Sequence, residues 1–296
     1  MLEFISIDKN IHLDGIAFRS LNFKGSITGY MDKKLFFVRL KDLIMKRTFL
    51  LIFSVIIYAS CFGWGQTGHR VTGQIAYNHL SKKVRKQIDK ILEGQSIAMV
   101  SNYMDEIKSE PLYDSLGPWH YCTIPDGEDY SGAPDEGDAI QAINKYIELL
   151  KSGKLSVEEE AFSLKCLIHL IGDIHQPLHV GNGTDRGGND VKVTYFWQSS
   201  NLHRVWDTGI VDGQNLSFTE YVEWIDSPTK EQVEQWKNDN VMVWVKESMS
   251  YRSQIYDLPD SKKINYRYNY DNISTVNSRL LKAGIRLAGV LEDIYG

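Results

Sequence analysis

Residues 161–179 read AFSLKCLIHLIGDIHQPLH, and this stretch decides the fold class of the chain. Ser156 and Glu159, just before it, form the pattern of a capping box, in which side chains satisfy free N–H groups at a helix start. Pro177 marks the end, because a proline restricts the residue before it away from helical backbone angles. The stretch therefore predicts a helix over Ala161–Ile174.

Histidine–aspartate pairs occur on this helix and again further along the chain. His169 and Asp173 are four residues apart, so both project from one helix face, and His179 follows just beyond the predicted helix end. His203 and Asp207 repeat the spacing. Imidazole and carboxylate groups are zinc ligands, and catalytic zinc sites leave one position open for water. One such pair is usually a surface hydrogen bond, but two pairs with additional histidines predict a metal centre. The additional histidines are His69 and His120.

Helical patterns dominate the rest of the chain after residue 63. Caps, stop residues and apolar periodicity predict helices over Lys82–Glu93 and Gly137–Ser152, a helix start at Ser217 with Glu220, a long helix from Ser227-Pro228 through Trp236 and Trp244, and a last helix over Asn277–Ile294. One segment, Val191–Trp197, alternates as a β-strand does after a glycine-rich turn. These patterns predict one mainly α domain with one short β-hairpin.

Length and composition fit a globular protein. The chain has 296 residues, 43% hydrophobic and 24% charged, so it can bury a sizeable core and wholesale disorder is excluded. Three cysteines are too few for a disulfide scaffold, and the pairing of Cys122 with Cys166 stays open. The formal net charge of −5 by itself disfavours a nucleic-acid or anionic-membrane partner, because such binders usually carry a basic surface.

The first 63 residues have the pattern of an export signal. Met45-Lys46-Arg47 precedes the apolar run Phe49–Ile57, and small residues follow at Ala59, Ser60, Cys61 and Gly63. The apolar run is shorter than the ~20 residues that a membrane-spanning helix needs. We therefore predict a signal peptide over residues 45–63 and a secreted or periplasmic mature chain over 64–296, with no transmembrane segment.

Two consequences follow from a signal at residues 45–63. Residues 1–44 have no place before it, which indicates that the true start is Met45 and that 1–44 are an extension placed too far upstream. Because residues 1–63 hold nine basic and five acidic side chains, their removal shifts the formal net charge from −5 to −9. A lipid anchor at Cys61 is the weaker alternative, because Tyr58 stands where such signals usually have Leu, Val or Ile.

Five motifs of the mature chain, taken in order, resemble those of the zinc-dependent single-strand nucleases, the family of nucleases S-one and P-one. They are Trp64-Gly65-Gln66-Thr67-Gly68-His69, Trp119-His120-Tyr121, the stretch Leu170–His179, the stretch Asn201–Thr208, and Ala283–Ala288. The matches run from Trp64 nearly to the C-terminus. The resemblance implies a single-domain α-helical nuclease P-one-like fold, which that family shares with zinc-dependent phospholipase C.

The resemblance also implies three Zn²⁺ ions in one cleft and assigns their ligands. The first ion would be held by Asp105, His120, His169 and Asp173. The second would be held by His179, His203 and Asp207. The third would be held by His69 with the free α-amine and carbonyl oxygen of Trp64, and Asp173 would bridge to the first. Asp105 has the weakest motif support, and Glu106 is its competitor.

Trp64 gives the predicted cleavage a chemical purpose. An α-amine, with a reference pKa of about 7.7–8.0, can bind zinc only as a free terminus, because an amide nitrogen is a poor ligand. Amine and carbonyl of one residue close a five-membered chelate ring. Cleavage after Gly63 would therefore be part of building the site.

The implied activity is that of a phosphodiesterase. Zinc lowers the pKa of bound water toward ~7, and paired metals stabilise both oxygens of an in-line displacement at phosphorus. By resemblance, the substrates are single-stranded DNA and RNA, cut to 5′-phosphorylated products, and 3′-nucleotides. Asp173 would orient the nucleophile, and Lys108 would meet a phosphate oxygen. Three zinc ions add +6, so we expect the metals rather than a basic groove to capture the phosphate of this acidic chain.

Substrate-binding residues are less well supported. Tyr121 would stack on a base, which contributes about 1–3 kcal/mol per base, although a core aromatic is an equal reading. The family usually has an acid two residues later; Thr123 stands there instead, which leaves base preference open, and Asp126 is a possible substitute. His175 is interpreted as a core or supporting histidine and His79 as structural or surface. The tryptophans Trp197, Trp206, Trp236 and Trp244 are expected in the core or lining the cleft.

Two other functions compete with the nuclease. A zinc-dependent phospholipase C acting on phospholipid head groups needs the same terminal Trp and His/Asp set, so the ligands alone do not separate the two. A non-catalytic zinc-binding envelope protein would be expected to use closed, cysteine-rich coordination, whereas this ligand set is rich in oxygen and nitrogen. No stable protein partner is predicted.

Overall fold

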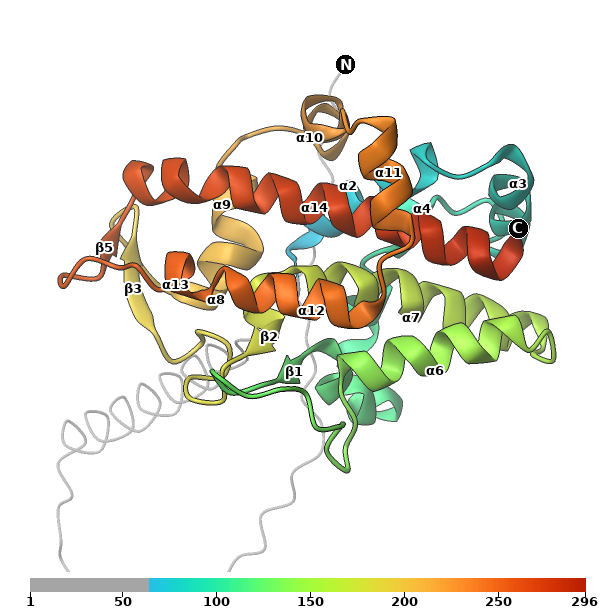
Figure 1. The fold of residues 1–296 in the computed structure, drawn as a ribbon, viewed down its shortest axis with the longest axis horizontal. Coiled ribbons are helices and arrows are strands. Elements are labelled where there is room, and N and C mark those ends of the chain that lie inside the picture. The colour runs from blue at the N-terminus through green and yellow to red at the C-terminus, as the bar shows by residue number, and fades with distance from the viewer. Residues whose placement is uncertain (1–63) are drawn as a thin grey trace, which may run out of the picture. The chain divides into compact units, whose positions relative to one another are not determined.

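The computed structural model describes residues 64–296 and shows a mainly helical domain (Figure 1). Its α-helices are α2 (Gln66–Asn78), α3 (Lys82–Ile91), α4 (Ile97–Val100), α5 (Tyr103–Glu106), α6 (Ala139–Lys151), α7 (Val157–His175), α8 (Leu202–Arg204), α9 (Ile210–Asp212), α10 (Phe218–Ile225), α11 (Lys230–Lys237), α12 (Val241–Ser250), α13 (Arg252–Ile255) and α14 (Tyr266–Tyr295). The 3₁₀ segments are η1 (Ile107–Ser109), η2 (Pro111–His120) and η3 (Pro177–His179), and η4 (Val205–Gly209) is a π-helical turn. The predicted fold class is confirmed.

Helix α7 lies at the centre of the fold because its C-terminal half is apolar on nearly every side. Its residues from Leu164 to His175, apart from the half-buried Lys165, are buried, and a helix that is apolar all round belongs in a core. Helix α6 packs along it, and α14 packs against both α7 and α2 (Figure 1). Gly284 allows the α14–α2 contact, since a Cβ there would lie 2.5 Å from Ile75 Cγ2.

Short strands connect segments that are far apart in the sequence. β1 (Cys122–Thr123) pairs in parallel with β2 (Val180–Gly181), with Cys122 opposite Val180. β3 (Lys192–Tyr195) and β4 (Gln198–Asn201) form the expected hairpin, and β5 (Lys263–Ile264) adds to β3 in parallel. Because β1 follows His120 and β2 follows His179, the first pair brings these two histidines together.

Most predicted helix boundaries are confirmed, with small shifts. The capping boxes at Ser156 and Ser217 are both present, and α7 begins at Val157, four residues before the predicted start. Ser81 caps α3 through its side chain, as expected, and Asp138 caps α6. Local cap chemistry therefore decides these helix starts.

Three secondary-structure predictions are wrong in extent. The long helix predicted from Ser227-Pro228 is two helices, α11 and α12, each with its own cap at Thr229 and Asn240. The last helix begins at Tyr266 rather than Asn277, after an Asn265 cap. The strand predicted over Val191–Trp197 ends at Tyr195, because Phe196 and Trp197 take positive φ values of 45° and 66° and turn the hairpin.

The predicted signal peptide, the upstream extension and the alternative lipid anchor at Cys61 lie outside the described residues. Within residues 64–296, none of the helices combines the length and apolar character that crossing a bilayer requires.

Candidate metal centre

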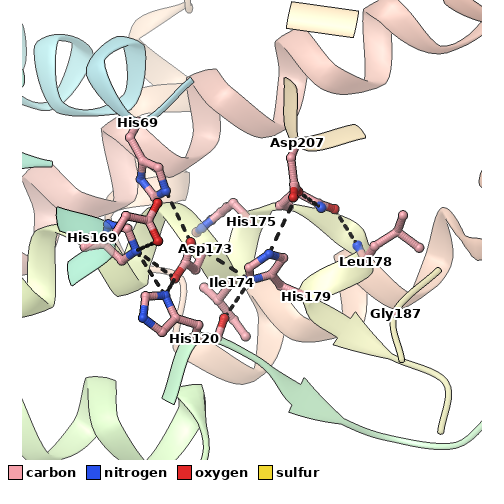
Figure 2. A network of polar contacts seen from close by, with 12 residues as sticks. His69, His120, His169, Asp173, Ile174, His175, Leu178, His179, Gly187 and Asp207 are labelled. Carbon is pink, nitrogen blue, oxygen red and sulfur yellow. Dashed lines mark hydrogen bonds and ion pairs between the residues drawn. The ribbon is translucent and has the colours of Figure 1, made fainter. Parts of the chain in front are cut away.

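Three groups of histidine and aspartate side chains meet around Asp173 near the end of α7 (Figure 2). In each group, one nitrogen or oxygen atom per residue lies within 4.8 Å of the others, which is close enough for one metal ion. The groups are His69–His169–Asp173, Asp105–His120–His169 and His179–His203–Asp207. The predicted side chains therefore come together, from α2, α5, η2, α7, η3, α8 and η4.

Asp173 joins the first two groups through both carboxylate oxygens. Its Oδ2 lies 2.8 Å from His120 Nδ1 and 3.1 Å from His169 Nε2. Its Oδ1 lies 3.3 Å from His69 Nε2 and 3.9 Å from His179 Nδ1. A single buried carboxylate thus faces four imidazoles, as Figure 2 shows, and it is the natural centre of the site.

Asp105, rather than Glu106, belongs to the group. Its Oδ1 lies 3.8 Å from His169 Nε2, whereas Glu106 is exposed on the same short helix. Lys108 Nζ lies 2.6 Å from the same Asp105 oxygen and keeps a positive charge at the edge of the site.

The second pair, His203 and Asp207, stands on a helix interrupted by the π-helical turn η4. His203 Nε2 lies 3.0 Å from Asp207 Oδ2, and His179 Nε2 lies 3.9 Å from Asp207 Oδ1. A π-turn inside an α-helix costs regular hydrogen bonding and is frequent at functional sites. Here it carries Asp207.

Backbone carbonyls fix the orientation of three imidazoles. Each accepts a hydrogen bond from a ring Nδ1, so Nδ1 carries the hydrogen and, in the neutral ring, Nε2 presents a lone pair to the group. The pairs are His169 Nδ1 with Ser101 O at 2.8 Å, His179 Nδ1 with His120 O at 2.6 Å, and His203 Nδ1 with Gly187 O at 2.7 Å.

The ionisation of these groups favours a bound cation. Burial lowers the pKa of His120 and His179 to about 4, so both are neutral at neutral pH, the form that binds metals. Burial also acts to lower the pKa of His169, but Asp173 and Asp105 outweigh it and raise that pKa. For Asp173, burial works to raise the pKa, yet His169 and His120 hold it well below its usual range. At His120 and His179, neutral rings therefore lie beside an ionised carboxylate.

The donor set fits a divalent metal ion. His179 Nε2 lies 3.9 Å from an Asp207 oxygen, so an imidazole nitrogen and a carboxylate oxygen are placed where both could bind one cation. Both ring nitrogens of His69 and the Oδ1 of Asp173 are buried and make no hydrogen bond of regular geometry, although His69 Nε2 and that oxygen lie 3.3 Å apart. Nitrogen and oxygen donors without cysteine are typical of catalytic zinc.

Gly172 lets His69 reach the centre from α2. The His69 ring stacks on His169, with centroids 4.1 Å apart and 14° between the planes. A Cβ at Gly172 would lie 2.8 Å from His69 Nδ1, closer than side-chain contacts allow.

The substitution Gly172→Ala is therefore expected to push His69 away and weaken zinc binding at least tenfold, as loss of supporting contacts commonly does. Zinc titration against a competing chelator measures this. Gly117→Ala is the matched control, because a Cβ there meets nothing within 4 Å. Equal affinities of the two variants would show that His69 does not need this approach.

Trp64 is fully buried where the described chain begins, directly before α2. The Gly65 N–H donates to Asp207 O at 2.6 Å, and a Cβ at Gly68 would lie 2.9 Å from Trp64 Cβ. The start of the predicted mature chain is therefore held between η4 and the helix that carries His69.

A cavity of about 310 Å³ opens beside the His179–His203–Asp207 group. Its lining includes Tyr121, Thr123, Leu178, Arg186, His179 and His203. The Tyr121 side chain is 43% exposed and so is not a core aromatic. The prediction that Asp126 substitutes for the missing acid is not supported: its carboxylate pairs with Arg252 at 2.5 Å, and Asp126 lines a different cavity.

The remaining histidines and cysteines have supporting roles. His175 is fully buried and contacts Ile171 O and Arg286, as a core histidine, and His79 pairs with Asp226 at 2.7 Å. Cys122 and Cys166 are buried free thiols.

Trp206 and Trp244 are in the core and Trp236 is half-buried, as predicted. The prediction for Trp197 is wrong, since it is 80% exposed at the hairpin turn.

Sequence patterns missed Gln176. Its side chain is fully buried, donates to Asp207 Oδ1 and accepts from the Leu178 N–H at 2.6 Å. It therefore connects the turn after α7 with the His179–His203–Asp207 group. It lies just past the helix end, where i, i+4 spacing gives no signal. Its place between a histidine and a proline in the metal motif was the available hint.

Comparison with known proteins identifies the family of the chain. The family model of the S1/P1 nucleases matches residues 64–296. The chain is 30% identical to Endonuclease 3 of Arabidopsis thaliana over 267 residues, which is 78% of this chain and 89% of that protein. It is 29% identical to Nuclease S1 of Aspergillus oryzae (79% and 92% covered) and 27% identical to Nuclease P1 of Penicillium citrinum (79% and 98%). The chain belongs to the S1/P1 nuclease family.

Proposed function

We propose that this family member is a zinc-dependent endonuclease of single-stranded DNA and RNA that leaves 5′-phosphorylated products and also acts as a 3′-nucleotidase. The observation that carries the proposal is the meeting of buried imidazole nitrogens and carboxylate oxygens in three adjoining groups. Such a donor arrangement suits cations. Two of the groups share His169, and the third approaches them through His179, 3.9 Å from Asp173, so the groups together favour a multinuclear site.

The proposed ligands follow the three groups. One ion would take Asp105, His120, His169 and Asp173, and a second would take His179, His203 and Asp207. A third would take His69, Asp173 and the amine and carbonyl of Trp64. When bound, zinc would supply a Lewis acid for the phosphoryl oxygens and a nucleophile at neutral pH.

The residues of the chain would supply orientation, charge and binding. Asp173, which faces four imidazoles, would orient the nucleophile. Lys108, beside Asp105, would place an ammonium group near a phosphate oxygen. Tyr121, half exposed at the 310 Å³ cavity next to His179 and His203, would stack on a base.

The proposed route to the active form is export and cleavage. Residues 1–44 would be an upstream extension, 45–63 the signal peptide and 64–296 the nuclease domain, secreted or periplasmic. The family match begins at Trp64, which supports cleavage before that residue.

A substrate panel tests the proposal. The chain beginning at Trp64 is incubated with single-stranded DNA, RNA, a 3′-nucleotide and phosphatidylcholine, and its zinc is counted. We expect cleavage of the three nucleic-acid substrates, 5′-phosphate ends, and loss of all activity on chelation. Cleavage of phosphatidylcholine alone would show a phospholipase C instead, and zinc without any hydrolysis would show a non-catalytic zinc protein.

A further inference from the structure

Two arginines lie fully buried beneath the metal centre, on the face of α14 that meets α7 and α12. They are Arg279 and Arg286, and both have no exposed surface. Arginine is almost never fully buried unless its charge is paired and its N–H groups are hydrogen-bonded. Arg286 belongs to the C-terminal family motif, yet neither arginine has a part in the chemistry proposed above.

Arg279 caps the C-terminal end of α7. Its Nε donates to His175 O at 2.9 Å, and a terminal nitrogen donates to Ser248 Oγ at 2.7 Å. The Ser248 hydroxyl in turn donates to Ile174 O at 2.9 Å. The last carbonyls of a helix lack partners within it, and a cation at that end is favoured by the helix dipole. Arg279 and Ser248 therefore satisfy the last two carbonyls of α7.

Arg286 fixes the last side chain of the same helix. Its guanidinium lies 3.1 Å from His175 Nε2, and because a guanidinium only donates, that nitrogen accepts. The His175 proton is then on Nδ1, which donates to Ile171 O at 2.7 Å. Glu247 accepts from both arginines, at 2.6 and 2.7 Å, and Asp239 accepts from Arg286 at 2.5 Å, so two carboxylates face the two guanidinium charges.

The end of α7 also separates Asp173, which lies on the helix, from His179, which follows it. Asp173 lies in the last turn, held by the helix itself. His179 lies four residues beyond the end, between the exit of the chain from His175 and the β1–β2 pairing that begins at Val180, so its position depends on both. Gln176 accepts from the Leu178 N–H and donates to Asp207 Oδ1, so the same turn also positions Asp207 of the His179–His203–Asp207 group.

We propose that Arg279, assisted by Arg286 and Ser248, is a positioning residue that fixes the end of α7 and thereby holds His179 in register with Asp173. This inference rests on the proposed function for the identity of the metal. The buried arginines would support the His179–His203–Asp207 group selectively. When the hydrogen bonds of Arg279 are weakened, Asp173 still keeps the hydrogen bonds of its own helix.

Arg279→Lys tests the inference, since lysine keeps the charge but cannot reach the four acceptors of the Arg279 guanidinium. Zinc per chain is counted after gel filtration, and zinc release to a chelator is timed, with far-UV circular dichroism as a check of folding. We expect about two zinc ions instead of three, and release of one ion at least tenfold faster than in the wild type. Arg267→Lys is the matched control: it lies on the same helix, exposed and paired with Asp271, and should keep three ions.

The outcomes separate this inference from the proposed function. A wild-type chain without zinc would contradict the proposed function. Three ions and unchanged release in both the wild type and Arg279→Lys, even with a lower unfolding temperature, would show that Arg279 only stabilises the fold. If Arg279→Lys does not fold, Ser248→Ala decides, because it removes a single hydroxyl: faster release of one ion supports the positioning role, and unchanged release contradicts it.

Discussion

Replacing Asp173 with asparagine is expected to abolish activity and metal loading together. The asparagine side chain would have the shape of the native carboxylate but no charge, and only one of the two oxygens would remain. The native carboxylate faces His69 and His120 at 3.3 and 2.8 Å, so the loss affects two of the three groups at once. We expect a rate at least 10³-fold lower, or about 4 kcal/mol of lost transition-state stabilisation.

The measurement is hydrolysis of single-stranded DNA together with zinc content for Asp173→Asn and for Asp293→Asn. Asp293 pairs with Lys151 at the surface, has no part in the proposed chemistry, and is the control for loss of one carboxylate. Both variants should fold. A normal rate in Asp173→Asn would remove Asp173 from the centre of the mechanism.

A chain that keeps a few extra residues before Trp64 is expected to lose one zinc ion and at least 100-fold in rate, or about 3 kcal/mol. The reason is chemical: the added peptide bond converts the Trp64 amine into an amide, which is a poor metal ligand. The surroundings leave little freedom to compensate, because Trp64 is fully buried and Gly65 is held by Asp207 O at 2.6 Å.

The control for this experiment is the same protein after proteolytic removal of the extra residues. Cleavage should restore both the third ion and the rate. Full activity with the extension still attached would contradict the role of the terminal amine, while leaving the histidine and aspartate ligands in place.

The sequence predicted those features of the fold that depend on local chemistry. The capping boxes at Ser156 and Ser217 give their signal within four residues, and the i, i+4 pairs follow from helix geometry alone. The break between α11 and α12, before the Asn240 cap, was not predicted, because the apolar residues on either side of it continue one helical periodicity. Tertiary contacts of α14 likewise extend its helix back to Tyr266, where the sequence is polar.

In the candidate site, too, local patterns were predicted and long-range contacts were not. Motif resemblance supplied the predicted ligand set, but nothing in the spacing of His69 or Asp105 requires them to meet His169. Their meeting depends on the α2–α7 approach at Gly172 and on the placement of α5 beside α7. Gln176 and Arg279 make hydrogen bonds to residues far away in the sequence, and such contacts leave no periodic signal in a sequence.

The most direct test of the account is a zinc-edge anomalous difference map from crystals of the chain that begins at Trp64. We predict three peaks, one in each donor group: between Asp105, His120, His169 and Asp173; between His179, His203 and Asp207; and between His69, Asp173 and the Trp64 terminus. A map without peaks, or with peaks away from these side chains, would contradict the central claim that the three groups form a zinc site.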